Sequence, residues 1–104
     1  MKILLCCGAG MSSGFLANNV KKAAKKRMLN ISVEAKSHVD AANHLTDADV
    51  LLLGPHYSTE KEKFEKVAEQ YHLTVAVIPG DIYGMLDGDA LLEYALSIIK
   101  GEIG

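Results

Sequence analysis

The chain has 104 residues, of which 49% are hydrophobic and 23% are charged, with a formal net charge of -2. These values are typical of a single soluble globular domain spanning residues 1–104, and so weak a charge argues against nucleic acid as a partner. No apolar run approaches the roughly 20 residues that a membrane span needs, and the N-terminal run is too short for a signal peptide, so we expect a cytoplasmic protein. The four histidines lack zinc-type spacing to a cysteine, so neither a metal nor another cofactor is expected.

The first half of the chain alternates strand and helix patterns. Residues 2–6 form a short apolar run that predicts a strand, and residues 31–35 alternate as a second strand does. A helix is predicted over 12–28, because apolar residues recur there on one stripe: Phe15, Leu16, Val20, Ala23, Ala24 and Met28. Residues 39–46 indicate a further short helix.

The second half continues the alternation. A buried strand is predicted over 49–53, where a Gly-Pro pair stops it, and another over 74–78, ended by Pro-Gly. The intervening helix, residues 59–71, has an inner face made of Phe64, Val67, Ala68 and Tyr71. A last helix is expected from about 88 to 100, with Asp87 as its N-cap.

This order of elements predicts the fold. Apolar strands separated by amphipathic helices indicate an α/β domain with a parallel sheet covered by helices on both faces. Right-handed crossovers favour four strands in the order 2-1-3-4. Ligands of such sheets bind at the carboxyl ends of the strands, near the point where the winding reverses. In this order the loop after the first strand lies at that point, and it begins with Cys7.

That loop has the composition of a phosphate site. Its glycines allow a tight turn with inward-pointing N-H groups, and the first turn of the following helix adds further N-H donors. The same field favours a thiolate over a thiol, which makes the cysteine a nucleophile for phosphorus. A buried cysteine that only packs is the alternative, and Cys6 fits it better because it lies within the strand. The predicted phosphoryl-binding segment is Cys7, Gly8, Ala9, Gly10, Met11, Ser12, Ser13 and Gly14.

Known phosphate motifs differ from this loop. A dinucleotide fingerprint fails because Ser13 stands where the third glycine belongs, and a Walker loop fails for lack of Gly-Lys-Ser/Thr. A cysteine phosphatase of the C-x5-R type would need arginine at position 13, yet the first arginine is Arg27. The loop thus favours a phosphoryl carrier over a hydrolase. A low-molecular-weight phosphatase or arsenate-reductase-like enzyme and a non-catalytic anion-binding module remain as alternatives.

Three segments resemble a known family. They are the strand and loop through Cys7-Gly8-Ala9-Gly10-Met11-Ser12-Ser13, the stretch from Ala48 to Gly54-Pro55, and Tyr83-Gly84 with Asp87-Gly88. Together they resemble the EIIB component of the bacterial phosphoenolpyruvate-dependent sugar phosphotransferase system, in its lactose/cellobiose/chitobiose group, over the whole chain. Position 56 departs from this pattern with His in place of the expected Gln, as do Gly14 and Pro79-Gly80.

The resemblance implies a function. Cys7 would accept a phosphoryl group from a phosphohistidine of the EIIA component and pass it to a sugar bound by the membrane component EIIC. It further implies a β-linked disaccharide or oligosaccharide, such as cellobiose, chitobiose or lactose, and names no metal. Loops after the later strands should surround Cys7 and form a rim or partner surface that includes Gly54, Pro55, His56, Tyr57, Asp81 and Tyr83.

Overall fold

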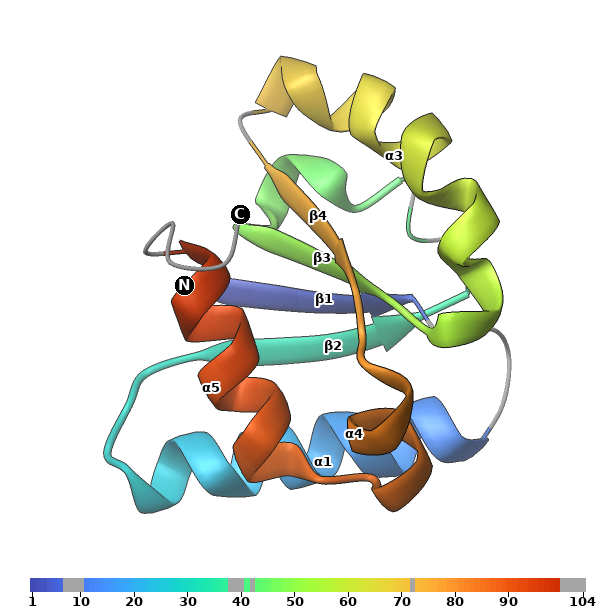
Figure 1. Cartoon of the computed structure of the whole chain (residues 1–104). Helices are drawn as coiled ribbons and strands as arrows, with labels where there is room; N and C mark the ends of the chain where they lie inside the picture. Colours follow the sequence, from blue (N-terminus) through green and yellow to red (C-terminus); the bar gives the residue numbers. More distant parts are fainter. Residues whose placement is uncertain (7–10, 38–40, 42, 72, 100–104) are drawn as a thin grey trace.

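The computed structural model describes residues 1–6, 11–37, 41, 43–71 and 73–99. Its centre is a sheet of four parallel strands in the order β2-β1-β3-β4 (Figure 1), as the sequence predicts. The strands are β1 Lys2–Cys6, β2 Ser32–Lys36, β3 Val50–Leu53 and β4 Thr74–Val77. The helices are α1 Met11–Lys26, α3 Lys61–Ala68, α4 Gly80–Met85 and α5 Gly88–Ile99, with 3-10 turns η1 Leu45–Asp47, η2 Pro55–Glu60 and η3 Glu69–Tyr71.

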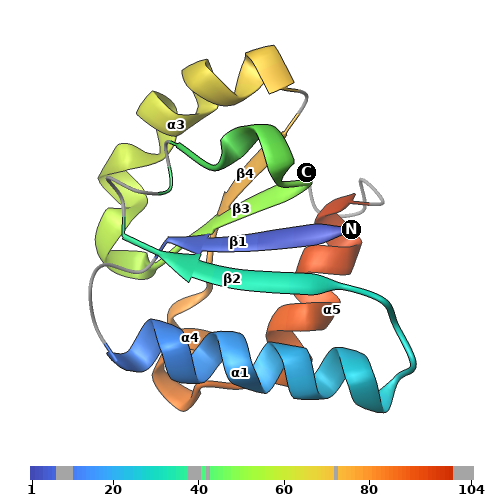
Figure 2. The same cartoon turned by 180° about the vertical axis from the view of Figure 1, so that it is seen from behind.

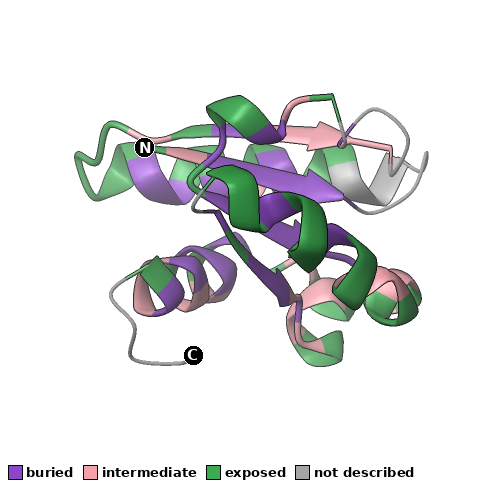
Figure 3. Cartoon of the chain, turned by 90° about the horizontal axis from the view of Figure 1, so that it is seen from above, coloured by how far each residue is buried: buried purple, intermediate pink, exposed green. Residues whose placement is uncertain are grey.

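Helices cover both faces of the sheet, because alternate residues of each strand point to opposite sides. In Figures 1 and 2, α1, α4 and α5 lie on one side of the strands and α3 lies on the other. Ile3 and Leu5 of β1 pack in the core beneath α1 and α5, whereas Leu4 and Cys6 pack in the core beneath α3. The central strands β1 and β3 are therefore buried along most of their length, which Figure 3 shows in purple.

The apolar stripes are narrower than the sequence predicts. Phe15 is 54% exposed although it neighbours the fully buried Leu16, because consecutive helical residues point about 100° apart. Val67 and Tyr71 were expected on the inner face of one long helix, yet both are exposed. The α-helix there ends at Ala68, and Tyr71 lies in the 3-10 turn that follows. Of the helix expected over 39–46, residues 39, 40 and 42 fall outside the described residues. Ala41 is helical, but residues 45 and 46 belong to the 3-10 turn η1.

The end of α1 also differs from the prediction. The helix stops at Lys26, and Met28, expected on the buried stripe, is 93% exposed with φ 58°. The N-H groups of Met28 and Leu29 donate to the carbonyl oxygens of Lys25 and Ala24 at 3.0 and 2.8 Å. These two bonds make a Schellman motif, in which the left-handed position usually belongs to glycine.

Replacing Met28 with glycine should therefore stabilise the protein. A left-handed conformation costs a residue with a Cβ about 1–2 kcal/mol, and glycine would remove this cost. Glycine also loses more conformational entropy on folding than methionine, which cancels only part of that stabilisation. We expect Met28→Gly to raise the free energy of unfolding by about 0.5–1 kcal/mol in urea titrations. Met28→Ala is the control, since it removes the exposed side chain but keeps the strain. Equal stability of the two variants would contradict the explanation.

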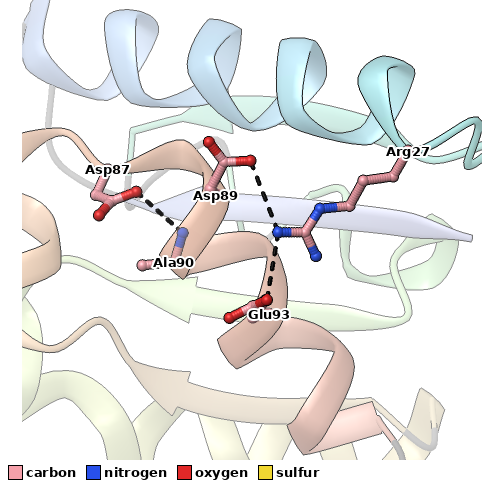
Figure 4. Close-up of polar contacts among 5 residues, drawn as sticks. All are labelled: Arg27, Asp87, Asp89, Ala90 and Glu93. Atoms are coloured by element: carbon pink, nitrogen blue, oxygen red, sulfur yellow. Dashed lines mark hydrogen bonds and ion pairs between the residues drawn. The ribbon is translucent and has the colours of Figure 1, made fainter.

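Two contacts fasten the start of α5, and the residues just before it, to α1. Gly88 lies so close to Asn19 that a Cβ on it would come 2.3 Å from the Asn19 carbonyl carbon. The Asn19 side-chain amide donates to the carbonyl oxygen of Leu86 at 2.8 Å, and Leu86 itself has φ 53°. The predicted N-cap is confirmed, because Asp87 Oδ1 accepts the N-H of Ala90 at 3.0 Å (Figure 4). These contacts fix where α4, just before α5, lies relative to α1.

Candidate functional site

The candidate site lies at the edge of the sheet where the parallel strands end. Cys6, the last residue of β1, is in register with Lys36 of β2 on one side and Leu53 of β3 on the other. Helix α1, which follows β1 in the chain, lies on one face of the sheet, and α3, which follows β3, lies on the opposite face (Figure 2). The winding thus reverses beside β1, which is where open α/β sheets bind their ligands.

The predicted phosphoryl-binding segment begins directly after Cys6. Cys7 and Gly8, Ala9 and Gly10 fall outside the described residues. The rest of the segment lies in α1: Met11, Ser12 and Ser13 open the helix, and Gly14 follows within it. The N-H groups of a first helical turn have no partner within the helix and carry the positive end of its dipole. The segment therefore includes helix-terminal donors, which are the usual protein ligands of a phosphate.

Close packing does not require a glycine at position 14. Gly14 is exposed, and a Cβ built on it would meet no atom within 4 Å. A larger residue would therefore fit at this position without a clash.

The turn after β3 is tied to the end of β1. Gly54 is buried, and its N-H donates to the Cys6 carbonyl oxygen at 2.8 Å. Pro55 opens the 3-10 turn η2, and the N-H of Tyr57 donates back to the Gly54 carbonyl at 2.9 Å. The predicted rim residues Gly54 to Tyr57 therefore lie at the same edge as the strand that precedes Cys7.

The segment after β4 holds a helix that the sequence analysis missed. The N-H of Ile78 donates to the Leu53 carbonyl at 2.7 Å, and Pro79 then caps the six-residue helix α4. Residues Pro79 to Asp81 had been read as a loop, because six residues are too few to show a helical period. Asp81 lies exposed in the first turn of α4, and Tyr83 lies half-buried in its middle.

One aromatic contact joins these two rim segments. The rings of His56 and Tyr83 have centroids 5.6 Å apart and planes at 84°, an edge-to-face arrangement. Such pairs favour the positive ring edge against the negative ring face. The structure thus brings His56 of η2 and Tyr83 of α4 together, which no pattern in the sequence could predict.

The arginine of the chain lies far from this edge. Arg27 follows the last residue of α1, and a 16-residue helix is about 24 Å long. Its guanidinium Nη2 lies 3.7 Å from Asp89 Oδ1 and 3.3 Å from Glu93 Oε1, both of α5 (Figure 4). Arg27 is therefore engaged at the opposite end of α1 from Met11, the first residue of the helix.

A lysine does lie at the edge, and the sequence analysis gave it no role. Lys36 ends β2, in register with Cys6. Its Nζ lies 4.0 Å from Glu34 Oε2, and the same oxygen lies 3.5 Å from Lys2 Nζ. Glu34 thus offsets part of the positive charge at the end of β2. The alternating pattern in the sequence ended at residue 35, so Lys36 was not expected at the end of this strand.

The described ranges contain neither a cluster of metal ligands nor a helix suited to a membrane. Within them, no three His, Cys, Asp or Glu side chains gather closely enough to hold a metal ion. None of the helices described is both long enough and apolar enough to cross a bilayer.

Comparison with known proteins gives a consistent result. A family model described as "PTS system, Lactose/Cellobiose specific IIB subunit" matches residues 2–94. The oligo-beta-mannoside-specific EIIB component of Bacillus subtilis is 37% identical over 97% of this chain and 98% of its own length. The cellobiose-specific EIIB component of Lactococcus lactis is 36% identical over 94% of this chain and 95% of its own length.

Solved structures share the fold. The lactose-specific IIB domain from Streptococcus pneumoniae superposes with a TM-score of 0.85 at 18% identity, covering 93% of this chain and 95% of that one. The cellobiose-specific IIB protein from Borrelia burgdorferi superposes with a TM-score of 0.79 at 29% identity, covering 98% of this chain and 94% of that one.

A longer relative contains a matching part. The lactose-specific EIICB component of Lacticaseibacillus casei is 28% identical over 91% of this chain, which matches 17% of that longer protein.

Proposed function

Because this chain belongs to the lactose/cellobiose-specific IIB family of the phosphotransferase system, it is an EIIB-type phosphotransferase component, and we propose that Cys7 carries its phosphoryl group. The observation that carries this proposal is where the described residues on either side of Cys7 lie in the fold. Cys6, just before it in the chain, ends β1 where the winding of the sheet reverses, and Met11, four residues after it, opens α1. Cys6 packs wholly buried beneath α3. We take residues 1–104 as one EIIB-type domain.

The reaction at Cys7 is an in-line displacement. The thiol first loses its proton to solvent, and the thiolate attacks the phosphorus of a phosphohistidine. An S-P bond forms as the P-N bond breaks, and the departing imidazole nitrogen keeps the electron pair and takes up a proton from solvent. Since the transition state is loose, donors that hold the phosphoryl oxygens do most of the work. N-H groups of residues 8 to 14 are the proposed donors, with the Ser12 and Ser13 hydroxyls assisting.

The second half of the reaction passes the group on. A sugar hydroxyl oxygen attacks the phosphorus, the S-P bond breaks, and the thiolate is regenerated as the hydroxyl proton leaves to solvent. We propose EIIA as the donor and a sugar held by EIIC as the acceptor. The lactose-specific relatives named EIICB support EIIC as a partner, since this chain matches a part of each. We place the reaction on the cytoplasmic side of the membrane.

The sugar is proposed from the relatives. Those reported above are named for oligo-β-mannosides, cellobiose and lactose, and β-linked glycosides are common to all three names. We propose a β-linked disaccharide or oligosaccharide as the acceptor.

The position of Arg27 separates this function from that of a phosphatase. A cysteine phosphatase needs a guanidinium on the phosphoryl oxygens to stabilise the transition state of hydrolysis. Here the arginine is paired with Asp89 and Glu93 at the far end of α1. We therefore expect the phosphorylated protein to persist in water until an acceptor arrives.

Dependence on EIIA tests the proposed donor. The chain is incubated with labelled phosphoenolpyruvate and the general phosphotransfer proteins, with or without a matching EIIA. We expect label on the chain only when EIIA is present, and no release of nitrophenol from p-nitrophenyl phosphate. Label acquired equally well without EIIA would refute the donor, and rapid phosphatase turnover would favour the rival enzyme. Binding of phosphate without any covalent label would favour the anion-binding module.

A further inference from the structure

His56 is an exposed residue whose ring nevertheless has a defined orientation. It lies second in the 3-10 turn η2, after Pro55. The ring of Tyr83, from α4, meets it edge-to-face with centroids 5.6 Å apart. Exposed side chains usually exchange among rotamers, and fixing one has an entropic cost. The aromatic contact offsets that cost and keeps the imidazole pointing in one direction.

His56 is also held close to the end of β1. The hydrogen bond from Gly54 N-H to the Cys6 carbonyl, at 2.8 Å, joins the start of this turn to the residue that precedes Cys7. Two residues of chain span at most about 7 Å, so the Cα of His56 lies within that distance of the Gly54 Cα. An imidazole on this backbone therefore lies at the same edge of the sheet as Cys6, the residue that Cys7 follows in the chain.

The chemistry of the edge leaves a role for such a side chain. A phosphoryl group presents three strong acceptor oxygens. Arg27 is at the other end of α1, and Lys36 faces the carboxylate of Glu34. An imidazole carries at least one N-H donor in either protonation state. His56 can therefore supply a directed donor without adding a permanent charge that would trap the phosphoryl group.

We propose that His56 donates a hydrogen bond to the phosphoryl group on Cys7 during transfer, and that Tyr83 orients the imidazole for it. This inference rests on the proposed function, since it needs the phosphoryl group on Cys7. His56 is then a catalytic residue, and Tyr83 is a positioning residue that acts through it.

Rapid-quench measurement of transfer from labelled phospho-EIIA tests the inference. We expect His56→Ala to slow the transfer step about tenfold or more at saturating donor, with little change in KM, as for the loss of one hydrogen bond to a charged group. His56→Gln should recover the rate to within about threefold, because its amide is also an N-H donor at a similar reach. Tyr83→Leu should slow transfer by about threefold, and Tyr83→Phe, which keeps the ring, by less.

The outcomes divide clearly. If the wild type takes no label from phospho-EIIA, the proposed function itself fails. If the wild type is labelled and His56→Ala transfers at the same rate, this inference fails alone. A raised KM with an unchanged maximal rate would also overturn it, because His56 would then only contact the partner protein. Circular dichroism confirms that each variant is folded. The transfer rates of His56→Ala and His56→Gln can be compared with each other even if both variants are less stable than the wild type.

Discussion

Cys7→Ser is expected to abolish phosphorylation of the chain, whereas Cys6→Ser is expected to retain it. A serine hydroxyl is almost wholly protonated at neutral pH and is a far weaker nucleophile than a thiolate. The rate of labelling should fall at least about a thousandfold, to background, as for the loss of an enzyme nucleophile. Phosphorylation by phospho-EIIA, followed by autoradiography of the protein, measures it.

Cys6→Ser is the matched control for this experiment. The Cys6 side chain is fully buried beneath α3. Placing a hydroxyl there costs stability, about 1–3 kcal/mol, but leaves the residue after it unchanged. Labelling should therefore be compared at a temperature where circular dichroism shows all three proteins folded. Label that persists on Cys7→Ser, or that is lost only from folded Cys6→Ser, would reject Cys7 as the carrier.

Gly88→Ala is expected to have the largest effect on the fold. A Cβ at this position would lie 2.3 Å from the Asn19 carbonyl carbon and 2.4 Å from its oxygen, so backbone and not a mobile side chain must move. Separating α5 from α1 also threatens the bond from Asn19 to Leu86. We expect a loss of about 3 kcal/mol in the free energy of unfolding, at the upper end of overpacking costs.

Gly84→Ala is the control for Gly88→Ala. Gly84 lies in α4, and a Cβ there would meet nothing within 4 Å. Alanine favours a helix over glycine by about 1 kcal/mol, so this variant should be as stable as the wild type or slightly more so. Urea titration of both variants measures the difference. If Gly88→Ala were as stable as Gly84→Ala, the close crossing of α1 and α5 would be wrong.

The sheet could be predicted because its signals are local. Residues 2–6 form β1 with the bounds expected from their apolar run, and the alternation of strands with helices sufficed for the order β2-β1-β3-β4. Right-handed crossovers leave few other arrangements of such a pattern. The same reasoning located the end of β1 at the reversal of the sheet.

Helix ends and side-chain exposure were predicted less well. Met28 continues an apolar stripe in the sequence, but the chain leaves the helix before it in a left-handed turn. Since glycine is the residue that usually signals such a turn, a methionine at this position does not indicate the end of the helix. Helix α4 has six residues, too few to show a helical period, so these residues were predicted as a loop.

The contacts of the site were beyond sequence reasoning. His56 and Tyr83 belong to segments that follow different strands, and their meeting depends on where α4 lies. That position depends in turn on Asn19 and Gly88, which hold the start of α5 against α1. Long-range packing of this kind has no local pattern, although both residues had been placed on the rim by the order of the strands.

The most direct test locates the phosphoryl group by mass spectrometry. Cleavage after Lys2 and Lys21 releases a peptide with both cysteines and the serines of the first turn of α1, and cleavage after Lys36 and Lys61 releases one with His56. Fragmentation that preserves the S-P bond should place the group on Cys7, and Cys7 should resist alkylation only in the phosphorylated protein. A group on Cys6, a serine or His56, with the Cys7 thiol still open to alkylation, would contradict the central claim.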